Sequence, residues 1–134
     1  MMSTPERGVL DTSVVIDMNS LPEDRLPAES TIAAVTMAEL SAGLHTTNDP
    51  AERAARAGRL QRAEAAWEPL PFDAGAARQY GQLVALVIAA GRKHRPRRLD
   101  LMIAATAAEG RLPLFTRNAD EFSGLESAVT VIGV

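Results

Sequence analysis

The sequence predicts an α/β protein with a mainly parallel central sheet of about four to five strands, flanked by helices. Short apolar segments of strand length alternate along the chain with longer segments of helical periodicity. That alternation is typical of a parallel sheet connected by crossover helices. The 134 residues suit one domain and contain no internal repeat. We therefore expect residues 1–134 to form a single domain, with residues 1–6 as a frayed N-terminus.

Composition excludes several kinds of site. The chain has no cysteine, so disulfides, thiolate zinc sites and cysteine nucleophiles are excluded. Its two histidines lie far apart in the sequence, which argues against a histidine zinc site. A metal site here would use oxygen ligands, which favours Mg²⁺ or Mn²⁺. The sequence has neither a signal pattern nor an apolar run of membrane-spanning length, so we expect a cytoplasmic protein with no membrane contact.

The first half of the chain predicts two strands and three helices. In order, these are a strand, a short helix, a strand and two longer helices, at residues 8–11, 14–18, 31–35, 36–46 and 50–67. Thr36 with Glu39 three residues later has the pattern of a capping box. Asp49 and Pro50 suit the start of the next helix. That helix has a weak apolar side, so we expect it near the surface or against a partner.

The second half predicts three strands, two helices and a helical turn. In order, these are a strand, two helices, a strand, the turn and a strand, at residues 69–72, 74–91, 99–109, 114–116, 118–122 and 129–132. Asp73 is the expected cap of the first of these helices, and Gly110 the expected C′ residue of the second. Helical spacing predicts a core face made of Tyr80, Leu83, Val84, Val87 and Ile88.

Acidic or amide side chains stand at four strand ends or helix starts. Each has an ordinary structural explanation. Asp11 can cap a helix, Glu39 can complete the capping box, and Asp100 can be a solvated residue of a first helical turn. In the last segment Asn118 can be an N-cap with Glu121 at the third helical position, where the two share a face.

The coincidence of these four segments points beyond capping. In a parallel α/β sheet, strand ends and the following helix starts lie along one edge. Several carboxylates on one edge repel one another unless a cation lies between them. A magnesium ion held by carboxylates and water serves phosphoryl chemistry. The pattern therefore favours a metal site that acts on a phosphate ester.

Four segments together resemble the motifs of PIN-domain ribonucleases, and their order and spacing resemble the VapC toxins of bacterial toxin–antitoxin pairs. The segments are Val9-Leu10-Asp11-Thr12-Ser13, Met37-Ala38-Glu39-Leu40 with Gly43, Leu99-Asp100-Leu101-Met102-Ile103-Ala104-Ala105, and Phe115-Thr116-Arg117-Asn118 with Glu121-Phe122. The resemblance covers essentially the whole chain.

The resemblance implies a role for each motif residue. Asp11 and Asp100 would bind Mg²⁺ or Mn²⁺, and Glu39 would bind it directly or through water. The fourth motif would add a further residue; we favour Asn118 and Glu121, although the commoner Asp-Phe ending reads Glu121-Phe122 here and leaves Asp120 as an alternative. Supporting roles fall to Thr12, Ser13, Thr116 and Asp120. The implied reaction is metal-dependent hydrolysis of RNA phosphodiester bonds, which inhibits translation and growth.

The resemblance also implies partners. A cognate VapB-type antitoxin would hold the enzyme inactive, and homodimers are usual in the family. RNA would bind to a dense basic run and to one further arginine, which together comprise Arg92, Lys93, Arg95, Arg97, Arg98 and Arg117. A solvated loop is the competing explanation of this run.

Four other functions compete with this interpretation. A catalytically silent PIN-like module kept for protein binding would suit a site that lacks one of its acids, but all four motifs are filled. An aspartyl phosphatase would favour Asp-x-Asp after the first strand, where this chain has Asp11-Thr12-Ser13. A response-regulator receiver would need a lysine after a late strand, and the sole lysine is Lys93. A nucleotide-binding site lacks a glycine-rich loop.

Overall fold

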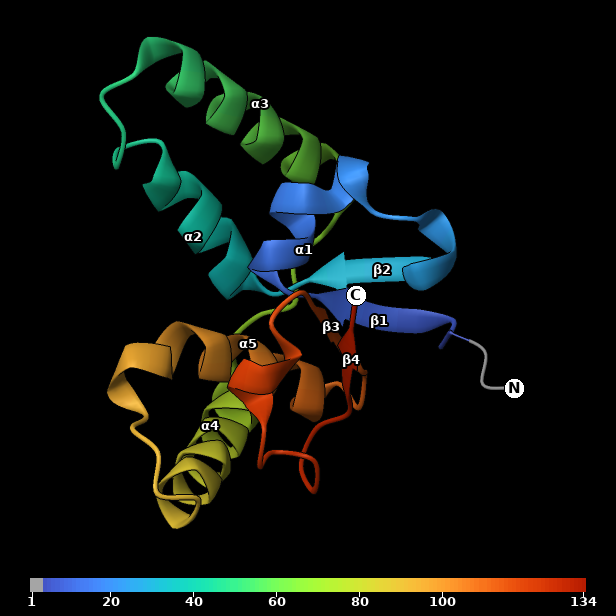
Figure 1. Ribbon diagram of the computed structural model, residues 1–134, viewed down its shortest axis with the longest axis vertical. Helices are drawn as coiled ribbons and strands as arrows, with labels where there is room; N and C mark the ends of the chain where they lie inside the picture. The colour runs from blue at the N-terminus through green and yellow to red at the C-terminus, as the bar shows by residue number, and fades with distance from the viewer. Residues whose placement is uncertain (1–3) are drawn as a thin grey trace.

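The computed structural model describes residues 4–134 and is an α/β fold built on one parallel sheet (Figure 1). The sheet has the order β2-β1-β3-β4. Its strands are β1 (Arg7–Leu10), β2 (Glu29–Ile32), β3 (Leu114–Thr116) and β4 (Val131–Gly133). The helices are α1 (Thr12–Asp17), α2 (Ala34–Gly43), α3 (Pro50–Ala66), α4 (Ala74–Ala89) and α5 (Arg98–Glu109). The predicted fold class is confirmed.

Alternation along the strands divides the core between the two faces of the sheet. Val9 and Leu114 are fully buried in one apolar cluster with α4 and α5. Their neighbours Leu10 and Phe115 are fully buried in the other cluster, with α1 and part of α3. Successive strand residues point to opposite faces, so these short strands serve both clusters.

The four longer helices form two pairs. Helices α2 and α3 pack together as one pair, and α4 and α5 as the other. Figure 1 shows the first pair at the top and the second at the bottom, with α1 close to the carboxyl ends of β1 and β2. Residues that leave β1 or β3, or that start α2 or α5, are therefore brought to the same edge of the sheet.

The predicted strand over residues 69–72 is wrong. Leu70 makes only an isolated bridge with Ala33. Pro69 and Pro71 flank it, and proline has no N–H to continue a ladder. The sheet thus has four strands. Two other strands are displaced from their expected positions: β2 begins at Glu29 and ends at Ile32, and β4 begins at Val131.

The predicted capping box is also wrong. Helix α2 begins at Ala34, with Ala33 as its N-cap and no capping side chain. The Ala34 N–H donates instead to the Leu70 carbonyl at 2.8 Å. A remote backbone segment therefore satisfies the helix start, and Thr36 lies within the first turn. Glu39 consequently has no capping role.

The other helix ends mostly follow the sequence. Asp49 caps α3 by accepting from Ala51 N–H, and Asp73 caps α4 by accepting from Ala76 N–H. Gly110 is not the left-handed C′ residue, because its φ is −78°. Arg111 takes that conformation, with φ of 55°. On the predicted core face of α4, Ile88 is the exception, since 58% of it is exposed.

Two hydrogen bonds hold the residues just before β1 against residues 24 and 29. Residues 1–3 of the expected frayed end lie outside the described residues. The Thr4 hydroxyl donates to the Asp24 carbonyl, and the Glu6 carbonyl accepts from Glu29 N–H. Among residues 4–134, no helix is both long enough and apolar enough to cross a membrane.

Candidate active site

Asp11 is a buried carboxylate held by three donors. It directly follows β1 and is 3% exposed. Its Oδ1 accepts from Thr12 N–H at 2.9 Å, while its Oδ2 accepts from the hydroxyls of Ser13 at 2.9 Å and Thr116 at 2.8 Å. An ionised carboxylate offers about four acceptor positions. One position on Asp11 is therefore left for a further ligand, and the carboxylate is fixed before that ligand arrives.

Glu39 reaches the same edge from α2. Its Oε1 accepts a hydrogen bond of 2.7 Å from the Thr12 hydroxyl. The oxygen of that hydroxyl also lies 3.0 Å from Thr36 Oγ1. Burial raises the pKa of Glu39, the Thr12 hydrogen bond lowers it, and the charge of Asp11 raises it further. The balance is a raised pKa.

Asp100 is the most perturbed acid of the site. It lies in the first turn of α5 and is half-buried. Burial is the largest cause that raises its pKa to about 6, followed by the charges of Asp11, Glu39 and Glu121, while Arg97 opposes the shift. Its carboxylate makes no hydrogen bond or ion pair with any residue in the range 4–134. Asp100 is thus an acid surrounded by other acids, without a donor of its own.

The fourth motif contributes Glu121. Its carboxylate forms an ion pair of 3.1 Å with Arg97, and its backbone carbonyl accepts from the same guanidinium at 2.7 Å. Asp120 and Asn118 are exposed. The Asn118 backbone N–H donates to the Thr116 hydroxyl, but its side chain does not cap the short 3₁₀ turn Ala119–Phe122. The charge that reaches Asp100 from this motif is therefore that of Glu121.

The donor set fits a hydrated hard cation. No group of three or more His, Cys, Asp or Glu side chains within residues 4–134 converges closely enough to enclose an ion. Magnesium is usually held by only one or two carboxylates and keeps several waters. Asp11 with one open acceptor position and Asp100 without a donor meet that requirement. A cation between them would also relieve the repulsion that raises the Asp100 pKa.

The PIN domain family matches residues 8–126 of the chain, a range that contains every acid of this site. This chain belongs to the PIN domain family. Two relatives confirm the expected resemblance to PIN domains of the VapC type.

Ribonuclease VapC5 of Mycobacterium tuberculosis (strain ATCC 25618 / H37Rv) is 40% identical over 134 residues, covering 98% of this chain and 96% of the relative. The chain also superposes on a solved structure from Mycobacterium tuberculosis with a TM-score of 0.85 at 37% identity, and the match covers 97% of this chain and 100% of that one. That structure, VapBC-5, is described as a member of the VapBC family of toxin–antitoxin systems. FitAcB from Neisseria gonorrhoeae superposes with a TM-score of 0.73 at 26% identity, over 93% and 96% of the two chains.

The basic run of this PIN domain is largely engaged with the protein itself. Arg92 donates to the carbonyls of Asp120 and Ser123, and Arg97 is held by Glu121. Arg98 donates to the Arg95 carbonyl. Outside the run, Arg117 forms an ion pair of 2.9 Å with Asp17. The side chains of Lys93 and Arg95 are exposed. Arg92 and Arg97 therefore hold the segment that contains Glu121, and Arg117 holds the end of α1.

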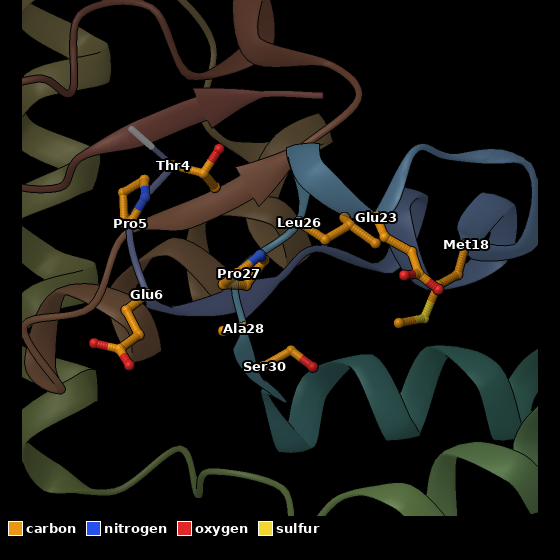
Figure 2. Close-up of a pocket in the computed structure, with 9 residues that line it drawn as sticks. All are labelled: Thr4, Pro5, Glu6, Met18, Glu23, Leu26, Pro27, Ala28 and Ser30. Atoms are coloured by element: carbon orange, nitrogen blue, oxygen red, sulfur yellow. The ribbon is translucent and has the colours of Figure 1, made fainter. Parts of the chain in front are cut away.

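A hollow of about 560 Å³ in this PIN domain contains none of the candidate acids (Figure 2). Thr4, Pro5 and Glu6 line one side of it, and the other side includes Leu26, Pro27, Ala28 and Ser30. These residues lie at the amino ends of β1 and β2, whereas Asp11 follows the carboxyl end of β1. The candidate site is therefore not in this hollow.

Sequence reasoning missed one contributor to the site. Thr36 is fully buried and its hydroxyl oxygen lies next to that of Thr12, which in turn holds Glu39. The capping-box interpretation assigned Thr36 to the wrong backbone position. No local signal marks the earlier start, because alanine and valine are poor N-cap residues beside threonine and the Leu70 carbonyl satisfies the first N–H of the helix instead.

Proposed function

We propose that this PIN domain is a divalent-metal-dependent endoribonuclease that acts as a VapC-type toxin and is inhibited by a VapB-type antitoxin. The observation that carries the proposal is Asp100, a half-buried acid with a pKa raised to about 6 and with no donor within residues 4–134, beside Asp11, Glu39 and Glu121. Perturbed acids that converge at a strand edge are characteristic of functional sites. The similarity to Ribonuclease VapC5 supports the same reaction.

Asp11 and Asp100 would hold Mg²⁺ or Mn²⁺, with Glu39 binding through water. When bound, such a cation supplies Lewis-acid stabilisation of the phosphate and activation of water. Side chains of the protein position these metal ligands. Ser13 and Thr116 fix Asp11 in one orientation by donating to its carboxylate.

Glu39 is suited to handle a proton. Its raised pKa makes its Oε2 a better proton acceptor than a solvated carboxylate would be, and Thr12 holds its Oε1 in place. Arg97 fixes Glu121 at the rim, where the pair lies beside the half-buried Asp100. These carboxylates exclude an anionic substrate unless a cation is present, so the arrangement itself favours a reaction that depends on metal.

Regulation and location follow from the proposed activity. A toxin that cuts RNA harms its own cell, so a protein inhibitor has to occupy the active site until the toxin is released from it. The related structure VapBC-5 belongs to a family of toxin–antitoxin systems, which supports such an inhibitor. An RNA substrate implies that the proposed enzyme acts in the cytoplasm.

Cleavage of RNA by the purified chain, freed of antitoxin, tests the proposal. We expect cutting with Mg²⁺ or Mn²⁺, none with EDTA, and none by Asp100→Ala. The matched control is Asp24→Ala, which removes an exposed aspartate from the short 3₁₀ turn Glu23–Arg25 and should leave cutting intact. Cutting that persists in EDTA, or in Asp100→Ala, would contradict the proposed site. Absence of cutting by the wild type with either metal would favour the silent binding module.

A further inference from the structure

Two arginines of α3 have no hydrogen-bonding or ion-pair partner among residues 4–134. Arg53 donates to the carbonyls of Leu44 and Thr47, and Arg56 donates to Gly43 and pairs with Glu52. Arg59 and Arg62, one and two helical turns further on, make no hydrogen bond or ion pair with any residue between 4 and 134. Their guanidinium groups are available to an external anion.

The two arginines line two adjoining hollows between α1 and α3. One hollow, of about 320 Å³, is lined by Thr12, Glu39 and Arg59 among others. A second, of about 230 Å³, is lined by Arg59, Arg62 and Trp67 among others. The two hollows share Ile16 and Arg59. We call them together the α1–α3 trough; it begins at the candidate active site and ends at Trp67.

The two ends of the trough have different chemistry. Its inner end has Thr12 and Glu39, which belong to the acidic site. Its outer end combines the apolar side chains of Val15 and Met18 with the ring of Trp67 and the amide of Asn19. The Trp67 indole N–H donates to the Ser30 hydroxyl at 3.2 Å, which fixes the ring. An aromatic ring beside an amide suits an unstacked nucleobase, and arginines suit the phosphates that connect it to the site.

We propose that the α1–α3 trough binds the RNA strand on one side of the bond to be cut, with Arg59 and Arg62 holding its phosphates and Trp67 stacking on one of its bases. This inference rests on the proposed function. A polyanion with one phosphate among four carboxylates needs compensating cations close by. Arg92, Arg97 and Arg117 bind other groups of the protein, whereas Arg59 lines the hollow that contains Glu39 and Arg62 lines the adjoining one.

Trp67 provides a direct signal, since it is the sole tryptophan of the chain. Binding is measured by quenching of its fluorescence and by anisotropy of a labelled single-stranded RNA of mixed sequence, in the full-length Asp100→Ala protein so that RNA stays intact. We expect RNA to quench Trp67. The variant Arg59→Ala/Arg62→Ala should lower the RNA affinity at least tenfold at low salt and reduce the salt slope by about 1.4, at about 0.7 per lost phosphate contact.

The matched control is Arg78→Ala, which removes the same charge from an exposed position on α4. Its neighbour Gln79 contacts Glu109 at the opposite end of α5 from Asp100, so this variant should bind RNA like the parent. Trp67→Phe should retain most of the affinity and Trp67→Ala should lose about tenfold, because stacking depends on a ring. In the active protein, Arg59→Ala/Arg62→Ala should raise KM much more than it lowers kcat.

Three results would overturn the inference. Unchanged RNA affinity and salt slope in Arg59→Ala/Arg62→Ala, with RNA cutting intact in the wild type, would refute the trough while leaving the proposed ribonuclease standing. Normal RNA binding by that variant with weakened inhibition by the antitoxin would make the trough a protein-docking surface. Binding of RNA without quenching of Trp67 would exclude the stacked base. Failure of the proposed function is separately visible, as absence of cutting by the wild type with metal.

Discussion

The Thr116 hydroxyl donates a hydrogen bond of 2.8 Å to the buried carboxylate of Asp11, joining the end of β3 to the end of β1. The same hydroxyl accepts from Asn118 N–H, so it also anchors the segment that leads to Glu121. We expect Thr116→Val to lower metal affinity and RNA cleavage by about 10–100-fold, as loss of an outer partner of a metal ligand does. Isothermal titration with Mn²⁺ and initial cleavage rates provide the two measurements.

The control for that prediction is Thr106→Val. Thr106 is also a buried threonine, but its hydroxyl donates to the Met102 carbonyl within α5 and makes no hydrogen bond with an acid among residues 4–134. This variant should keep wild-type metal affinity. Equal losses in both variants would mean that the effect of Thr116→Val comes from general destabilisation and not from Asp11.

Asp100 should make the metal-free protein less stable as the pH rises. The folded-state pKa of about 6 lies above the ordinary value of 3.8, so between these values the folded state binds more protons than the unfolded state. The stability that Asp100 contributes is therefore full below about pH 3.8 and is lost as the pH rises through about 6. After allowance for solvent screening at this half-buried position, the loss is on the order of 1–2 kcal/mol.

Asp100→Asn tests this by removing the titration. In EDTA at pH 7.5 we expect the variant to exceed the wild type in free energy of unfolding by about 1 kcal/mol, and the difference to vanish near pH 4. Urea denaturation at several pH values gives both quantities. A variant less stable than the wild type at pH 7.5 would show that Asp100 has a stabilising donor after all.

Divalent metal should reverse the repulsion among the acids. A ligand that binds only the folded state at a concentration about a hundred times its Kd stabilises that state by about 2.7 kcal/mol. For a chain of this length that corresponds to a rise in Tm of roughly 5–10 °C. Thermal unfolding with and without Mn²⁺ should show this rise in the wild type and little of it in Asp11→Asn or Asp100→Asn. An equal rise in all three proteins would place the metal elsewhere.

The parts of the fold that could be predicted depend on local chemistry. Strand β1 was recognisable from a short apolar run before the capping residue Asp11. Asp49 and Asp73 cap helices as expected, because an Asp side chain reaches only the helical turn that follows it. The β3 segment Leu114–Thr116 was predicted correctly for the same reason. Each of these features is decided within a few residues.

The parts that could not be predicted depend on contacts between remote segments. Helix α2 starts at Ala34 because the Leu70 carbonyl accepts its first N–H, and no pattern near residue 34 contains that information. The partners of Arg97 and Arg117 lie 24 and 100 residues away. The positions of Asp11 and Asp100 were predictable as a strand end and a helix start, whereas Glu39 lies in the second turn of α2 because that helix starts earlier than expected. The roles of the cations around these acids required the tertiary structure.

Glu121, not Asp120, should be the fourth acid that acts on Asp100. Its charge helps to raise the Asp100 pKa and its carboxylate pairs with Arg97, whereas the Asp120 carboxylate makes no contact of either kind within residues 4–134. Glu121→Gln removes a negative charge and releases Arg97, and both changes favour ionised Asp100. We expect the pH midpoint for Asp100, followed through the pH dependence of Mn²⁺ binding, to fall from about 6 towards 3.8 in this variant. Asp120→Asn should leave the midpoint where it is, and the same downward movement in Asp120→Asn would assign the fourth position to Asp120.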